Sequence, residues 1–366
     1  MEYKERIVYA DLLRICAAAA VAVLHTAASR WYAAPAHTFN WEIMNVYGGL
    51  TRWAVPVLIM VSGALQFRPV SSFNAQQLSC KEEYRIIFKK RILRIIYALI
   101  FWSIVYNGYH LIVRHFVWRE PVMFGDIAAI PLKIIFGPAW HHLWFLYIVI
   151  GLYLITPLVR IFIAHAQKGH IKSFLVLAGI IGSGVPFFNF IVSKIPALSA
   201  YRVYFPAPEL SGYMGYYVAG YYFSTNDIRK HTRILFYLLA LVSAVFTILG
   251  TSYWSAAGRP EDFLYGNILP TTMLLSFSIF LFFKKAFGAK RLDQKQIQTL
   301  CEVSRCTLGI YLFHDLVLQI FSLWGLTAVS FNPIIAIPLI GMVVFFISLI
   351  VISLIKKIPI LEKYII

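Results

Sequence analysis

Three polar residues interrupt the first long apolar stretch of the chain. Asp11 and Arg14 lie three residues apart in the segment DLLRICAAAAVAVLH, and His25 ends it. On a helix Asp11 and Arg14 share a face, and His25 returns to within roughly 20° of Arg14, about 16 Å further along. An imidazole can accept or donate a proton near neutral pH. The spacing therefore predicts a candidate catalytic histidine on one stripe with an acid and a cation.

Each of these residues also has an ordinary structural interpretation. Asp11 and Arg14 can neutralise each other at a spacing of three, which lowers the cost of placing two charges within a membrane. A histidine near a helix end is often a hydrogen-bonded residue at the membrane interface. The alignment of His25 with the charged pair is what favours a chemical role.

A second candidate is the basic segment KEEYRIIFKKRILRIIY, in which Arg91 and Arg94 lie one helical turn apart and Lys90 precedes them. Two guanidinium groups at this spacing can bind phosphate with paired hydrogen bonds. Basic residues at cytoplasmic helix ends also set membrane orientation and contact anionic lipid. The segment is therefore either a site for a phosphate-bearing donor or a determinant of topology.

Polar residues near the start of the second apolar stretch could bind a polar ligand. Arg52, Glu42 and Asn45 supply polar contacts, and aromatic neighbours supply stacking surfaces. An anchoring role at the membrane interface is the alternative for Arg52.

Histidines occur at two later positions. His142 and Trp144 open the fourth apolar stretch, and His314 lies about seven residues into the ninth, where it could flank a donor channel or make a polar contact between helices. Adjacent histidines such as His141 and His142 diverge by about 100° on a helix, and no cysteine or carboxylate lies nearby in the sequence. We therefore expect no metal.

These residues must be positioned by membrane helices. Of the 366 residues, 60% are hydrophobic and only 13% are charged, which excludes a cytosolic enzyme, a disordered chain and a small disulfide scaffold. Ten stretches are apolar enough to cross a bilayer, which predicts an all-α polytopic membrane protein. They cover residues 8–29, 45–67, 92–113, 142–164, 173–193, 211–225, 232–251, 267–283, 307–324 and 332–355.

The chain has 33 Lys and Arg residues against 16 Asp and Glu residues, a formal net charge of +17. Most of the basic residues fall in the segments on the N-terminal side of the membrane, so both termini are expected to be cytoplasmic. The positive charge is thus explained by orientation, and we expect no nucleic-acid partner.

The motifs and their order resemble the acyltransferase-3 family of integral membrane proteins. The resemblance rests on the R-x10-H spacing of Arg14 and His25, on the RxxR of Arg91 and Arg94, and on the segments IMVSGAL, HHLWFLYIVIGLYLITPL and CTLGIYLFH. Within that family, WEIMNVYGGLTRWAVPVLIMVSGAL is most similar to the stand-alone polysaccharide O-acetyltransferases of the enterobacterial common antigen type.

The resemblance implies one transmembrane acyltransferase domain over residues 1–366, without a fused extracytoplasmic domain, in the cytoplasmic membrane of a bacterium. It also implies transfer of an acetyl group from cytoplasmic acetyl-CoA to a surface glycan or lipid-linked sugar on the outer side. The donor phosphates would then bind Arg91 and Arg94, and the acceptor sugar would bind near Arg52, Glu42 and Asn45. His25 would meet the sugar hydroxyl, either as a general base or by carrying the acyl group itself.

A secondary transporter or flippase for a glycan or lipid precursor is the alternative, since ten spans with charges in the membrane also describe carriers. Carriers often contain internal repeats. We find no correspondence between residues 1–170 and 200–366, and the R-x10-H motif has no second copy.

Overall fold

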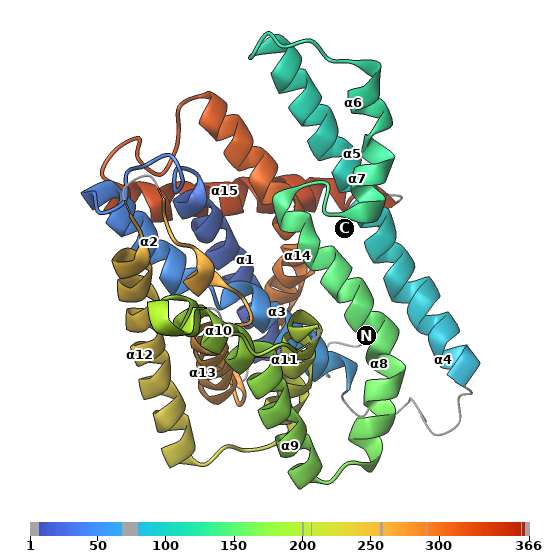
Figure 1. Cartoon of the computed structure of the whole chain (residues 1–366). Helices are drawn as coiled ribbons and strands as arrows, with labels where there is room; N and C mark the ends of the chain where they lie inside the picture. Colours follow the sequence, from blue (N-terminus) through green and yellow to red (C-terminus); the bar gives the residue numbers. More distant parts are fainter. Residues whose placement is uncertain are drawn as a thin grey trace.

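The computed structural model describes residues 7–67, 80–199, 201–205, 207–256, 259–290, 292–359 and 361–362, and these form helices joined by loops (Figure 1). The α-helices are α1 (Val8–Ala28), α2 (Phe39–Thr51), α3 (Ala54–Gln66), α4 (Cys80–Ile87), α5 (Leu93–Phe116), α6 (Phe124–Ala128), α7 (Ile130–Phe136), α8 (Trp144–His165), α9 (Lys168–Gly179), α10 (Val185–Ser193), α11 (Pro208–Thr225), α12 (Lys230–Trp254), α13 (Pro270–Phe287), α14 (Gln294–Leu323) and α15 (Pro333–Ile355). Shorter 3-10 turns include His141–Leu143 and Phe263–Tyr265, and π turns occur at Phe88–Ile92 and Ile180–Gly184.

Within the described residues, nine helical segments are long and apolar enough to cross a membrane, and they contain nine of the ten predicted stretches. The chain is therefore an all-α polytopic membrane protein, as predicted. The tenth stretch, 211–225, forms α11, whose buried residues include four tyrosines. Because α3, α9 and α13 pack around α11, neighbouring helices rather than lipid cover its polar atoms.

Two glycines explain why α3 and α11 approach so closely. A Cβ atom on Gly63 would lie 1.8 Å from the carbonyl oxygen of Tyr217, and one on Gly220 would lie 1.8 Å from the carbonyl oxygen of Met60. Each helix thus places a glycine against the backbone of the other. Small residues at a helix interface allow this contact in membranes, so the Ser-Gly of IMVSGAL serves packing.

The break between α2 and α3 follows from Pro56. Proline has no N–H, and its ring clashes with the carbonyl group four residues earlier, which here belongs to Arg52. The helix is interrupted at Arg52 and Trp53 and resumes at Ala54. The interruption places Arg52 at a bend within a membrane span.

Helix α1 is held in the interior by α2, α3, α13, α14 and α15. The carboxylate of Asp11 accepts a hydrogen bond of 2.6 Å from the hydroxyl group of Ser304 on α14, and its Oδ1 lies 3.6 Å from Nη1 of Arg14. The predicted pairing of Asp11 with Arg14 is confirmed, and Ser304 adds a tether between two distant parts of the chain.

The place of His314 seven residues into the ninth stretch predicted a depth similar to that of Arg14, and this depth was wrong, because the ring lies 5.0 Å from that of His25. The ninth stretch was expected to begin at residue 307, but α14 begins at Gln294, where Asp293 caps it by accepting a 2.8 Å hydrogen bond from the backbone N–H of Gln296. Ser304 lies at the level of Asp11. His314 is ten residues beyond Ser304, or about 15 Å further along, so it lies deeper than Arg14.

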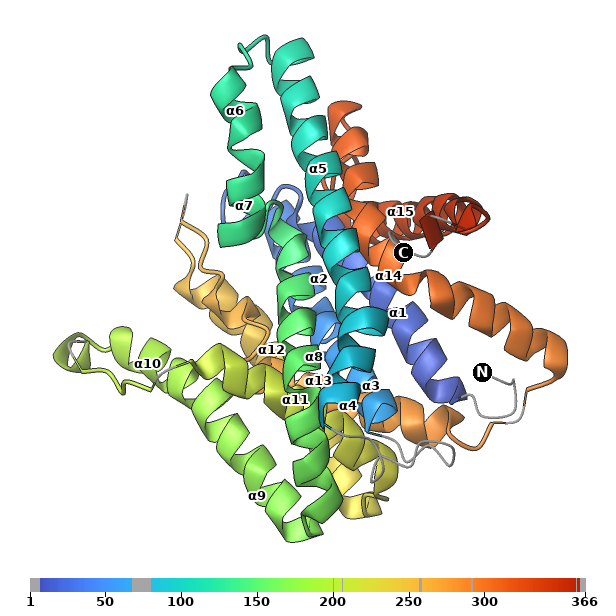
Figure 2. The same ribbon diagram turned by 90° about the vertical axis from the view of Figure 1, so that its right-hand side faces the viewer.

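The end of α5 and helix α6 extend beyond the rest of the bundle (Figure 2). At the tip, Arg114 binds Glu120 at 3.2 Å and Asp126 at 3.1 Å, which fixes the turn from α5 to α6. The chain then returns through α7 to the turn that carries His141 and His142.

Candidate active site

Four histidines from three segments meet around His25. Its ring centroid lies 5.0 Å from that of His314, 5.3 Å from that of His141 and 6.3 Å from that of His142. Helix α1 supplies His25, the 3-10 turn before α8 supplies the adjacent pair, and α14 supplies His314. We call these four residues the histidine cluster.

A buried carboxylate completes the cluster. Asp315 is 3% exposed, its Oδ1 lies 3.4 Å from Nε2 of His141, and its Oδ2 accepts a 2.6 Å hydrogen bond from the indole of Trp140. The carboxylate therefore holds the side chains of two consecutive residues that precede α8. It also places a negative charge beside the imidazole of His141.

Hydrogen bonds to the backbone fix the two buried histidines of the cluster. His314 has Nδ1 2.6 Å from the carbonyl oxygen of Tyr311, so this nitrogen donates. Tyr311 donates from its hydroxyl group to the carbonyl oxygen of His142 at 2.7 Å. Among the described residues, Nε2 of His314 and both ring nitrogens of His142 are buried without a hydrogen-bond partner.

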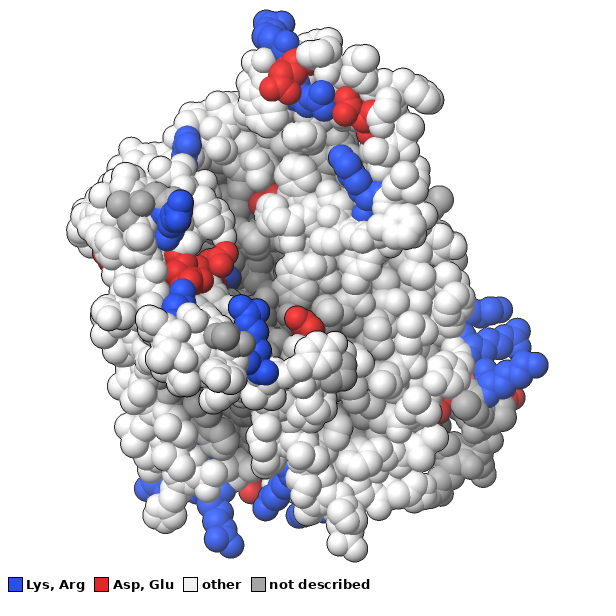
Figure 3. Space-filling model, in the orientation of Figure 1, with Lys and Arg blue, Asp and Glu red and all other residues white. Residues whose placement is uncertain are grey.

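A wide cavity of about 1180 Å³ opens beside the cluster. Its walls include His25, His141 and Asp315, the aromatic side chains of Trp31, Tyr32 and Tyr265, and the charged side chains of Arg52, Arg202, Glu209 and Asp262. Figure 3 shows a hollow on this face of the molecule with acidic and basic side chains at its rim. We call it the wide cavity.

A second cavity of about 430 Å³ is strongly basic, and we call it the basic pocket. Its walls include Arg14, Lys90, Arg91, Arg94, Arg305 and Lys356. The structure thus brings Arg14 together with the basic segment that the sequence singled out. The π turn at Phe88–Ile92 contains Lys90 and Arg91, and such turns redirect side chains within a helix. The sequence did not predict that Arg305 and Lys356 belong to this pocket, because neither lies in a recognisable motif.

One helix connects the two cavities. On α1, Arg14 lines the basic pocket and His25 lines the wide cavity. Tyr311 also lines the basic pocket, and its ring centroid lies 5.8 Å from that of His314. The histidine cluster therefore lies between a cationic pocket and an aromatic cavity.

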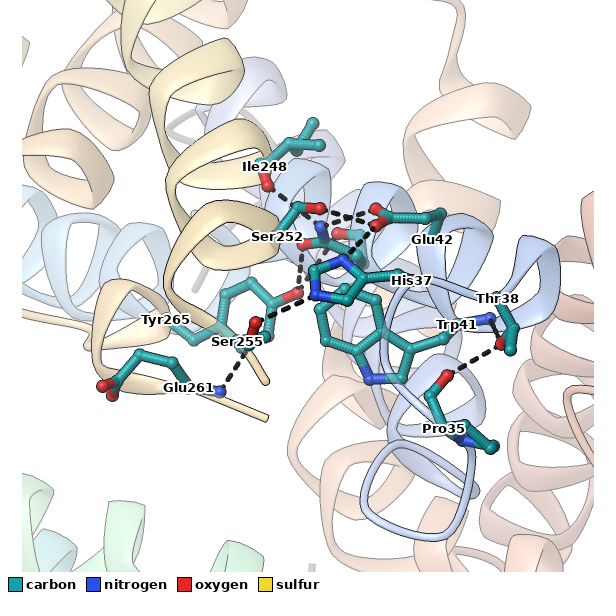
Figure 4. Close-up of polar contacts among 11 residues, drawn as sticks. Pro35, His37, Thr38, Trp41, Glu42, Ile248, Ser252, Ser255, Glu261 and Tyr265 are labelled. Atoms are coloured by element: carbon teal, nitrogen blue, oxygen red, sulfur yellow. Dashed lines mark hydrogen bonds and ion pairs between the residues drawn. The ribbon is translucent and has the colours of Figure 1, made fainter. Parts of the chain in front are cut away.

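The residues predicted to bind a sugar are divided by the structure. Arg52 lines the wide cavity, with its guanidinium carbon 4.1 Å from the ring centroid of Tyr265. Asn45 and Glu42 instead join α2 to α12: Asn45 donates to the carbonyl oxygen of Ile248 at 2.9 Å, and Glu42 accepts from Ser252 at 2.6 Å (Figure 4). Neither is among the residues that line the wide cavity.

The residues at the start of α8 are divided in the same way. His142 is fully buried, and Trp144 packs with its ring centroid 5.8 Å from that of Tyr213. His141 is the member of the pair that lines the wide cavity. His314 lies in the cluster and is not among the residues that line the basic pocket.

The absence of a metal stays a prediction, but one of its two reasons, that no carboxylate lies near His141 and His142, does not hold in the structure. A carboxylate does lie close in space, because α14 brings Asp315 to the histidines. Ligand atoms of His25, His141 and Asp315 all lie within 4.8 Å of one another. The same groups suit proton transfer, so the geometry alone is compatible with either chemistry.

The fold and the site define a polytopic membrane protein with a histidine cluster between a basic pocket and an aromatic cavity. A family model described as an acyltransferase domain matches residues 7–355, so the chain belongs to the acyltransferase-3 family. The predicted family is confirmed. No curated protein and no solved structure matches the chain.

Proposed function

We propose that this protein is a membrane O-acetyltransferase that moves an acetyl group from acetyl-CoA to a hydroxyl group of a surface polysaccharide or its lipid-linked sugar precursor. The observation that carries the proposal is the position of Arg14 and His25 on one helix, the first in the basic pocket and the second in the wide cavity. Family membership supports acyl transfer.

The basic pocket suits the donor. Coenzyme A carries several phosphate groups, and Arg91, Arg94 and Lys90 place three cations in the wall of a pocket that also contains Arg14. Guanidinium groups bind phosphate with paired, charge-assisted hydrogen bonds. A donor anchored there would direct its thioester toward the histidine cluster.

The wide cavity suits a sugar. Trp31 and Tyr265 make part of its wall aromatic, and the exposed ring of Tyr32 offers a flat face to the carbon face of a pyranose ring. Arg52 and Asp262 offer polar groups to the hydroxyl groups of the sugar. Its volume exceeds that of many sites for small molecules, so it leaves room for more than one sugar unit.

His25 is the group that meets both substrates. As a general base, it takes the proton of the sugar hydroxyl while the oxygen attacks the thioester carbon. In the other route His25 attacks first and carries the acetyl group to the sugar. Acetylated protein that forms from labelled acetyl-CoA before acceptor is added would identify the second route.

The proposed direction of transfer follows from the charge distribution of the sequence. Basic residues favour a cytoplasmic position for both termini in a bacterial inner membrane, which places the basic pocket toward the cytoplasm and the wide cavity toward the outside. Assignment to polysaccharide O-acetyltransferases of the enterobacterial common antigen type belongs to the same proposal.

Sealed vesicles containing the protein in one orientation test this function. Radiolabelled acetyl-CoA is supplied on the side of the termini, and polysaccharide isolated from the surface of the producing bacterium on the other. We expect label in the polysaccharide with the wild-type protein and none with His25→Ala. Transfer only when both substrates share the side of the termini would refute transfer across the membrane. Passage of glycan without acylation would favour the transporter alternative.

A further inference from the structure

His141 has no part in the function proposed above, yet it is the second imidazole in the wall of the wide cavity. Its side chain is half exposed, whereas the Asp315 carboxylate beside it is buried. His142 and His314 are fully buried, so they do not offer a ring to a substrate in this cavity. The part of the cluster that a substrate in this cavity can reach therefore consists of two imidazoles, with a buried carboxylate beside His141.

We propose that His141 is a second catalytic residue, which donates a hydrogen bond to the carbonyl oxygen of the thioester as negative charge develops there, and that Asp315 is its positioning residue. This inference rests on the proposed acyltransferase function. It separates two roles: His25 handles the proton of the sugar hydroxyl, and His141 stabilises the oxyanion.

The separation of the two rings supports this division. The centroids of His25 and His141 are 5.3 Å apart. Rings this close leave no room for a carbon atom between them, but a nitrogen of each ring lies within 4.8 Å of one on the other. A tetrahedral carbon in the wide cavity that faces both rings can therefore present its attacking oxygen to one nitrogen and its oxyanion to the other. Donors preorganised around a developing oxyanion are among the largest contributions to catalysis.

Asp315 explains why His141 is suited to donate. A carboxylate 3.4 Å from Nε2 of His141 stabilises the protonated imidazole and orients its ring. The indole N–H of Trp140 donates a 2.6 Å hydrogen bond to the other carboxylate oxygen. This bond holds Asp315 in place from the residue that directly precedes His141. The other titratable groups around His141 are the rings of His25, His142 and His314.

The step balances without any further reactant. The sugar O–H bond breaks and its proton passes to His25, while the oxygen forms a bond to the thioester carbon. The electron pair of the C=O double bond moves to oxygen, where His141 donates its hydrogen bond. The C–S bond then breaks as the carbonyl re-forms, and the thiolate takes the proton from His25. Thioester and alcohol become ester and thiol, and His141 keeps its proton.

The test uses the full-length protein in vesicles with radiolabelled acetyl-CoA and the isolated surface polysaccharide. His141→Gln is expected to lower kcat by about 10²–10³-fold with little change in the KM for acetyl-CoA. Asp315→Asn should lower kcat less, because the imidazole remains. His115→Gln is the matched control, since His115 is exposed on α5 away from both cavities.

Chemical rescue separates catalysis from structure. Added imidazole should restore activity to His141→Gly, since the wide cavity admits a small molecule, and thermal unfolding of the variants should match that of the wild type. Full activity of His141→Gln would overturn the inference, as would an activity loss that imidazole does not restore. Stoichiometric zinc in the wild-type protein that is lost in His141→Gln would also overturn it, because His141 would then be a ligand. An inactive wild-type protein would instead refute the proposed function itself.

Discussion

The rings of His25 and His314 lie 5.0 Å apart although 289 positions separate the two residues in the sequence. Earlier on the same two helices, Ser304 donates to Asp11 at 2.6 Å. Because the two contacts occur in the same order along α1 and α14, these helices run in the same direction. Asp11 and His25, at opposite ends of α1, thus both contact α14.

Replacing His25 with alanine is expected to abolish acyl transfer while the protein still folds and inserts, because no other group on α1 can accept the hydroxyl proton in the wide cavity. Label incorporated into polysaccharide measures activity, and size-exclusion behaviour in detergent measures folding. Substantial acetylated polysaccharide from well-folded His25→Ala would contradict the assignment. His115→Ala serves as the control.

Replacing Arg91 or Arg94 with alanine is expected to raise the KM for acetyl-CoA by about tenfold or more, because each change removes a charge-assisted hydrogen bond to phosphate. A saturating concentration of acetyl-CoA should partly restore the rate of transfer. Arg85→Ala is the matched control, since Arg85 is exposed on α4 and does not line the basic pocket. An unchanged KM for acetyl-CoA would mean that the two arginines set the orientation of the protein in the membrane and do not bind the donor.

Replacing Arg52 with alanine should raise the KM for the polysaccharide acceptor by about tenfold and leave the KM for acetyl-CoA unchanged, because its guanidinium lines the wide cavity against Tyr265. Initial rates at varied concentrations of the polysaccharide measure the KM for the acceptor. Arg30→Ala, at an exposed position outside that cavity wall, should behave like the wild type. A shift in the donor KM instead would exclude acceptor binding by Arg52.

Asn45→Ala is expected to act on stability. The change removes the part-buried 2.9 Å bond to the carbonyl oxygen of Ile248 and the buried 2.6 Å bond from the hydroxyl group of Tyr265, at a cost of about 1–3 kcal/mol. Thermal unfolding in detergent should show a lower midpoint. A normal midpoint together with a raised acceptor KM would mean that Asn45 contacts the sugar.

Gly63→Ala and Gly220→Ala are expected to destabilise the protein by about 1–3 kcal/mol or more, because each new methyl group meets the backbone of the facing helix, which cannot move without separating α3 from α11. Gly108→Ala is the control: no heavy atom lies within 4 Å of its added Cβ, and alanine suits a helix better than glycine. Equal midpoints for all three variants would disprove tight packing of α3 on α11.

The sequence alone determined the fold class and much of the site. Hydropathy predicted nine of the membrane-crossing segments, and the pattern of charges inside them identified Asp11, Arg14 and His25, because a charge within lipid is costly and therefore conspicuous. Periodicity along one helix also predicted correctly that Asp11 and Arg14 pair. These conclusions depend on local composition and on contacts within a single helix.

Contacts between helices were decided by the tertiary structure. His141 and Asp315 are 174 positions apart, and nothing in either segment indicates the other, so the cluster around His25 could not be assembled from spacing. The same holds for Arg305 and Lys356 in the basic pocket, and for Asn45, whose amide is used by α12. Hydropathy shows which segments enter the membrane, but side-chain packing and buried hydrogen bonds decide which faces meet there.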